Sequence, residues 1–195
     1  MPTVTALREG RRGRIAVELD GAPWRVLPAD VVVRVGITEG RSLDRSSLRE
    51  LRRELRRADA LRVAGRALRT RDLSRRDLAA RLERASVAPA AAAESLATLE
   101  RAGLVDDTRV CGARAHALAA RGYGDEAIRH RLARGGFDPE VADQAVTALE
   151  PEAERALGLV QRRGQGPRTA RYLAARGFGE EAVETALGAA FGQDA

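Results

Sequence analysis

The feature that most constrains the fold of this 195-residue chain is a stretch of sequence that occurs twice and then, more loosely, a third time. Residues 74–100 and 124–150 align at an offset of 50 without a gap, and apolar positions recur at a further offset of 41, as in Leu132 and Leu173. Repetition at this period is typical of stacked helical units that bury their apolar faces against one another. The sequence therefore predicts a mainly α-helical protein with tandem three-helix repeats in an elongated array.

The composition agrees with a helical core, because 44% of the residues are hydrophobic but only 3% are aromatic. Such a core must be built from Leu, Ala and Val, which pack well between closely spaced helices. Pairs such as Leu78 and Leu82, or Ile128 and Leu132, are four residues apart and mark the buried face of a helix. We predict helices at 59–70, 75–85 and 89–102, at 107–121, 125–134 and 139–149, and at 152–163, 167–176 and 180–190.

The first residues have a different pattern. Three short segments with partial alternation lie within residues 4–27, and Asp20-Gly21 is a strong hairpin turn signal. We expect a small β-hairpin or three-strand unit, then a short helix at 29–35 closed by Gly36 and a second helix capped by Asp44 or Ser46. The predicted parts are the N-terminal β-hairpin with its helices at 1–57 and three-helix repeats at 58–104, 105–150 and 151–195.

Local signals support the ends of the repeat helices. Asp138-Pro139 has the pattern of an N-cap followed by proline at the first helical position, and Gly135-Gly136 and Gly177 lie where helices should end. Val87, Phe137 and Phe178 recur in the link between the second and third helix of each repeat. We interpret these apolar residues as plugs between two helices and not as ligand contacts.

Arginines lie on the outward side of each middle helix. Third helices instead carry acidic residues, several of them in the first turn, where the helix dipole favours negative charge. If stacked repeats align their middle helices, the arginines form a broken basic stripe that could meet an acidic partner. The predicted partner-binding residues are Arg76, Arg81, Arg84, Arg129, Arg131, Arg134, Arg168 and Arg171.

The net charge of +6 comes from 34 basic residues, all of them arginine, against 28 acidic residues. The basic excess is in the N-terminal half, where residues 1–57 contain 13 arginines and 8 acids. Arg49, Arg52, Arg53, Arg56 and Arg57 follow one another on the predicted helix from Asp44, interleaved with Glu50 and Glu54. Such a run is either a solvated helix face or a contact surface for an acidic partner, and both readings stay open.

The sequence offers no chemistry typical of an enzyme. The two histidines, His116 and His130, lie on different predicted helices, and one cysteine, Cys111, can form neither an internal disulfide nor a zinc cluster. Without lysine there is no phosphate-binding loop of the Walker type, and no Ser, His and Asp triad is evident. We expect a protein that is not an enzyme, has no cofactor or metal, and is soluble, cytoplasmic and monomeric.

Three segments together resemble the RecX family of bacterial regulators of the RecA recombinase. They are Gly103-Leu104-Val105-Asp106-Asp107-Thr108-Arg109, Ala120-Arg121-Gly122-Tyr123-Gly124 and Ile128-Arg129-His130-Arg131-Leu132-Ala133-Arg134-Gly135-Gly136-Phe137. The N-terminal hairpin and the turn at 36–40 also look like the extended N-terminus of many members. The chain departs from the family pattern at Val110-Cys111, Asp125-Glu126 and Ala127, which we expect to weaken the contact surface of the second repeat.

The resemblance implies a stack of three-helix units that binds the RecA filament on single-stranded DNA. Such a protein would mostly inhibit filament extension, strand exchange, ATP turnover and the co-protease activity of the SOS response. The family resemblance thus assigns the predicted arginines to acidic patches of the filament, with single-stranded DNA as a further partner, contacted directly or through RecA.

Two other functions remain open from the residues alone. The chain could be a direct DNA-binding module, since short three-helix units resemble helix-turn-helix domains, although the acids on third helices disfavour insertion into a groove. It could also be a helical adaptor for another protein.

Overall fold

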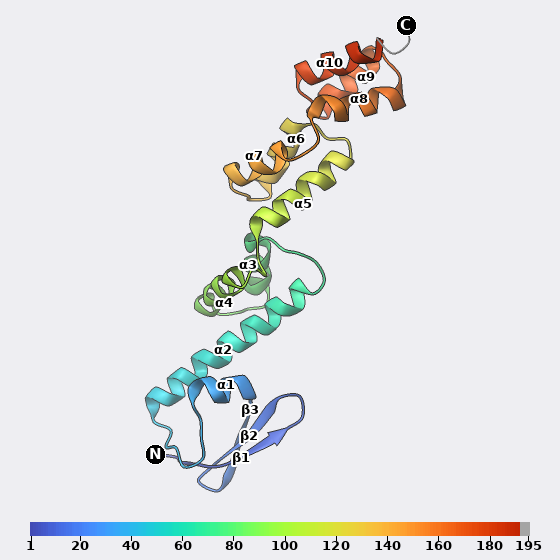
Figure 1. Cartoon of the computed structure of the whole chain (residues 1–195). Helices are drawn as coiled ribbons and strands as arrows, with labels where there is room; N and C mark the ends of the chain where they lie inside the picture. Colours follow the sequence, from blue (N-terminus) through green and yellow to red (C-terminus); the bar gives the residue numbers. More distant parts are fainter. Residues whose placement is uncertain (192–195) are drawn as a thin grey trace. The chain divides into compact units, whose positions relative to one another are not determined.

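A computed structural model describes residues 1–191 (Figure 1). Within these residues the chain forms ten helices and one three-stranded sheet, so the predicted mainly α-helical class with tandem three-helix repeats is confirmed. The chain divides into two compact units, which are described separately. The N-terminal unit contains residues 1–72 and 77–104, and the C-terminal unit contains residues 73–76 and those from 105 onward.

The predicted β-structure forms an antiparallel meander of β1 (Val4–Gly10), β2 (Arg14–Leu19) and β3 (Ala22–Pro28). The Asp20-Gly21 turn joins β2 to β3 with φ of 51° and 83°, and two successive positive φ values are typical of a type I′ hairpin. Val4, Val17 and Leu27 point from the sheet into a core, where they meet valines of the following helix. The sheet is therefore stabilised by the helices after it, as expected for so few strands.

Helix α1 (Ala29–Val35) ends at Gly36, whose φ of 67° is the left-handed conformation predicted for that position. Arg41 donates from Nη1 to the carbonyl oxygens of Val35 and Gly36, at 2.6 Å each. These bonds satisfy carbonyls that the helix end leaves without an intrahelical partner. They also fix the loop that leads to the next helix.

Helix α2 (Arg45–Leu68) is longer than predicted. Asp44 caps its start by accepting a hydrogen bond from the Ser47 N–H at 2.7 Å, as expected. The prediction of two helices that meet near residue 58 is wrong, because Ala58 and Asp59 contain no helix breaker and Ala60 continues the buried face. The predicted limit after residue 57 thus lies inside a helix, and the division into four parts remains a prediction.

The remaining helices agree with the predicted segments to within two residues. Two complete the N-terminal unit, except that the first two residues of α3 belong to the C-terminal unit. They are α3 (Arg75–Arg84) and α4 (Pro89–Arg101). The others are α5 (Asp107–Ala120), α6 (Asp125–Arg134), α7 (Pro139–Thr147), α8 (Glu152–Arg163), α9 (Pro167–Ala175) and α10 (Glu180–Phe191).

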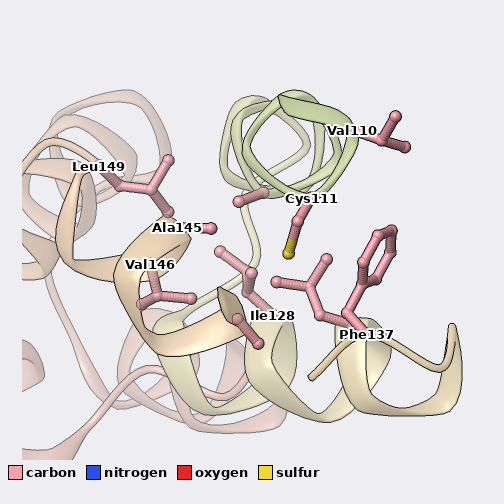
Figure 2. Close-up of a cluster of buried hydrophobic side chains, with 10 residues drawn as sticks. Val110, Cys111, Ile128, Phe137, Ala145, Val146 and Leu149 are labelled. Atoms are coloured by element: carbon pink, nitrogen blue, oxygen red, sulfur yellow. The ribbon is translucent and has the colours of Figure 1, made fainter. Parts of the chain in front are cut away.

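Each three-helix group of the C-terminal unit has its own core. Helix α5 packs against α6 and α7, and Figure 2 shows Cys111 of α5 pointing into the cluster that contains Ile128, Phe137 and Val146. Burial raises the pKa of the Cys111 thiol, which therefore stays protonated at neutral pH. Val87, Phe137 and Phe178 were predicted to plug the angle between helices. This is confirmed for Phe137 and Phe178, which are buried in these cores, whereas Val87 is only partly buried.

Candidate partner-binding surface

Helix α6 presents three of the predicted arginines. Gly124 is the N-cap of this helix, and Ile128 and Leu132 hold it to the core with almost no exposed surface. Residues four apart share a helix face, so Ile128 and Leu132 define the buried side, with Arg129 and Arg131 on its flanks and Arg134 directed away from the core. All three arginines are exposed, as predicted.

The structure pairs one of these arginines with an acid of the third helix. Arg129 donates from Nε to Oδ1 of Asp143 on α7, at 2.8 Å. Both side chains are about half exposed, so this ion pair contributes little to stability but lowers the positive charge available to a partner. Sequence reasoning treated middle-helix arginines and third-helix acids as separate surfaces, and here they meet.

Arg76 lies beside the end of α6. Its Nη1 donates to the carbonyl oxygen of Arg134 at 3.4 Å, and its side chain covers Gly136. Gly136 has a φ of 79°, and a Cβ there would collide with the Arg76 guanidinium. The structure thus brings together Arg76 and the backbone of Arg134, which are 58 residues apart.

Helix α9 carries Arg168 and Arg171, and both side chains are exposed. Arg171 donates from Nε to the carbonyl oxygen of Pro167 at 3.2 Å, on its own helix. In the N-terminal unit, Arg81 and Arg84 on α3 are likewise exposed, and Arg84 donates from Nε to the Ala80 carbonyl at 3.1 Å. These bonds within a helix leave the guanidinium groups accessible.

An arginine and tyrosine ladder in the C-terminal unit was missed by sequence reasoning. Guanidinium groups and rings alternate in the order Arg131, Tyr123, Arg176, Tyr172 and Arg163, with successive separations of 3.9, 4.6, 5.3 and 3.8 Å to the ring centroids. Such cation–π contacts favour a fixed packing of neighbouring helices. The sequence did contain a hint of this ladder. At the offset of 41 residues, Arg131 of the second repeat aligns with Tyr172 of the third, so an arginine and an aromatic ring occupy equivalent positions.

A partly buried polar joint lies next to this ladder. The Glu152 carboxylate accepts hydrogen bonds from the N–H groups of Asp125 at 2.5 Å and Gly179 at 3.2 Å, one at each oxygen. Arg155 pairs with the Asp125 carboxylate and donates to the Tyr123 carbonyl at 3.0 Å. These bonds join α8 to the starts of α6 and α10.

Gly124 makes this joint possible by the absence of a side chain. A Cβ at this buried position would overlap the carbonyl group of Gly177, so the two backbones can approach closely only with glycine. The Gly124 N–H donates to the Arg176 carbonyl at 3.0 Å across this contact. The arginines of α6 and α9 are therefore carried on a connected framework.

Metal ligands do not gather in the described part of the chain. Among residues 1–191, no group of three or more His, Cys, Asp or Glu side chains could hold a metal ion. His116 and His130 are both exposed. No helix of the described residues has the length and apolar character needed to cross a bilayer.

Comparison with known proteins identifies the family. No family model matches the chain. The regulatory protein RecX of Chromohalobacter salexigens is 34% identical over 140 residues, which span 67% of this chain and 90% of that protein. The chain belongs to the RecX family. RecX of Xanthomonas axonopodis pv. citri is 34% identical over 126 residues, or 60% of this chain and 78% of the relative. RecX of Deinococcus radiodurans is 31% identical over 145 residues, or 69% and 70%.

Solved RecX structures share the fold. A crystal structure of regulatory protein RecX superposes with a TM-score of 0.82 at 20% identity, and covers 94% of this chain and 98% of its own. RecX from Lactobacillus salivarius gives a TM-score of 0.60 at 16% identity, over 68% and 94%. RecX proteins are regulatory proteins without enzymatic activity, which agrees with the expectation that this chain is not an enzyme.

Proposed function

We propose that this chain binds the RecA filament on single-stranded DNA and inhibits its ATPase, recombinase and co-protease activities. The observation that carries the proposal is the 34% identity to a RecX protein over 90% of that protein's length. The regulator has no catalytic step of its own. It acts by occupying a surface that the filament needs.

The arginines of α3, and separately those of α6 and α9 in the C-terminal unit, supply the contacts in this proposal. They are exposed, and they lie on helices that buried leucine or isoleucine side chains hold in place. A planar guanidinium can hold a carboxylate or a phosphate with two parallel hydrogen bonds, so the surface suits acidic patches of RecA and the DNA inside the filament. Repeated weak contacts to a polymer reinforce one another through effective concentration.

The members of this surface are unequal. Arg129 is paired with Asp143, and Arg131 is packed on the Tyr123 ring. We therefore expect Arg81, Arg84, Arg168 and Arg171 to contribute more to binding than Arg129. This ranking agrees with the weaker contact surface that we expected in the second repeat from its departures from the family pattern.

A direct test adds the protein to RecA assembled on single-stranded DNA and follows ATP hydrolysis and strand exchange. Near-stoichiometric protein should reduce both rates, and binding to the filament should be measurable by co-sedimentation. If the protein neither binds the filament nor inhibits it at that ratio, the proposal is refuted.

A further inference from the structure

Four arginines of α2 lie on one face of the helix. Arg49, Arg52, Arg53 and Arg56 are spaced at i, i+3, i+4 and i+7, which places their side chains within about 100° of arc. All four are exposed, whereas Leu51 on the opposite side is buried. We name this set the α2 arginine face. It lies in the N-terminal unit and shares no residue with the surface proposed to contact RecA.

The α2 arginine face lines a groove of about 320 Å³ between α2 and the start of α4. Ala88, Ala90 and Ala91 line the α4 side, and Glu94 is the one acid among the described lining residues. Glu94 is already engaged, because its Oε1 lies 3.1 Å from Nε of Arg57, a residue outside the groove. The groove therefore has a strong excess of positive charge.

Comparison of the repeats shows that acids are missing next to these arginines. The second copy has Asp138 and Glu140 at the start of its third helix, and the first copy has Ala88 and Ala90 at the corresponding positions. The first turn of α4 contains no acidic residue, unlike the first turns of α7 and α10. The repeat thus lacks negative side chains at the place where they would neutralise the α2 arginine face.

Little within the N-terminal unit compensates the repulsion between these like charges. Among residues 1–191, the α2 arginine face forms one ion pair, in which Nη2 of Arg53 lies 3.5 Å from Oε1 of Glu54. Like charges three or four residues apart disfavour a helix, so the arrangement is unfavourable until an anion binds. A ligand with several negative charges in a row would relieve it.

The dimensions and chemistry of the face fit a phosphodiester chain. Seven residues of α-helix span about 10 Å, which corresponds to about three charges at the spacing of roughly 3.4 Å per charge along one DNA strand. Guanidinium groups bind phosphate oxygens in pairs. We propose that the α2 arginine face binds the phosphate backbone of nucleic acid directly, without RecA.

A protein partner fits this groove less well. Stable protein interfaces are usually anchored by buried aromatic or large aliphatic side chains, and the apolar lining here is alanine alone. The exposed large hydrophobic residues of the described chain are Met1, Val26, Val33 and Leu104, and none lines the groove. Backbone phosphates need no such anchor.

The test measures fluorescence anisotropy of a labelled 30-nucleotide oligo(dT) with the full-length protein and no RecA, across a series of salt concentrations. Arg49, Arg52, Arg53 and Arg56 are together changed to glutamine, which keeps helix propensity and polarity. Affinity at low salt should fall at least tenfold. The slope of log K against log salt should shrink by about 2, because about three phosphate contacts are lost and each removes about 0.7 on single strands.

A matched control removes the same number of charges from the same unit but outside the groove. It changes Arg66, Arg69, Arg71 and Arg101, all exposed, to glutamine. This variant should retain most of the affinity, and circular dichroism should show native helix content for both. Equal losses in the two variants would show that net charge alone governs binding and would overturn the proposal.

A second readout separates this inference from the proposed function. Inhibition of RecA is measured in parallel for each variant. Loss of inhibition with unchanged oligonucleotide binding would assign the α2 arginine face to RecA and refute a nucleic-acid site. Because the binding assay contains no RecA, its result stands whether or not the chain inhibits the recombinase.

Discussion

Leu82, Leu132 and Leu173 fill the corresponding position of three successive middle helices, and each has 1% or less of its surface exposed. Their recurrence in the sequence predicted a shared core role, and the structure confirms it. A leucine held this tightly cannot be shortened without leaving a cavity.

Leu132→Ala should lower the free energy of unfolding by about 2–5 kcal/mol, because buried contacts are lost and a void remains. Urea denaturation followed by circular dichroism measures this change. Arg134→Ala, two residues away and exposed, should change stability by no more than about 0.5 kcal/mol. Similar losses in both variants would contradict the packing described for α6.

Residue identity alone did not reveal the roles of all polar side chains. Arg129 and Arg131 have the same type and a similar helical setting, yet the first binds a carboxylate and the second packs on a ring. Which of these happens depends on Asp143 and Tyr123, which approach only when three helices pack together. The eight arginines remain a predicted site, now with a structural reason to rank them.

Helix ends are where short sequence signals were most informative. The start of α2 at Asp44 and the start of α7 at Asp138 were predicted from one or two residues, and both carboxylates accept the expected backbone hydrogen bonds. The hydrogen bond from the Ser47 N–H lowers the pKa of Asp44. The stability that the Asp44 cap gives to the protein should therefore depend on pH.

Asp44→Ala should lower the melting temperature at pH 7, and the difference from the unchanged protein should be smaller when the melts are repeated at pH 2. The reason is that a pKa lowered by folding gives stabilisation above the ordinary aspartate pKa, which is lost as the pH falls through the lowered value. Thermal melts at both pH values measure it. Asp44→Ser retains a cap that does not titrate, so its melting temperature should exceed that of Asp44→Ala at both pH values. An equal effect of Asp44→Ala at pH 7 and pH 2 would rule out the ionised cap.

Glu152→Ala should destabilise the protein by about 2 kcal/mol, because two backbone N–H groups at the starts of α6 and α10 lose a charged acceptor. The urea midpoint reports this loss. Glu154→Ala is the comparison, since Glu154 lies two residues further along α8 and is exposed. If the two variants unfold at the same midpoint, the Glu152 joint is unimportant.

The whole molecule distributes its positive charge over two proposed surfaces, one for RecA on the middle helices and one for nucleic acid on α2. Both consist of arginines that are held on helices by apolar residues facing inward. Because charge is abundant across the chain, tests of either surface need variants with identical charge changes elsewhere.

Arg84→Glu should weaken inhibition of RecA severalfold, while Arg101→Glu should leave it nearly unchanged. The two residues are a close match, because each is exposed at the last position of its helix and donates from Nε to the carbonyl four residues earlier, at 3.1 and 3.2 Å. ATP hydrolysis by RecA on single-stranded DNA is the measurement. Equal inhibition by both variants would exclude Arg84 from the contact surface.

The sequence by itself determined the helices, their buried faces and the family, because apolar spacing, caps and repeated positions act over a few residues. It misjudged α2, where an interruption was expected between two segments that share one continuous apolar face. Only the tertiary structure decided which arginines are paired with Asp143, stacked on Tyr123 and Tyr172, or gathered around the groove beside α4. These contacts join residues from different helices, so they depend on helix packing, which local sequence patterns do not specify.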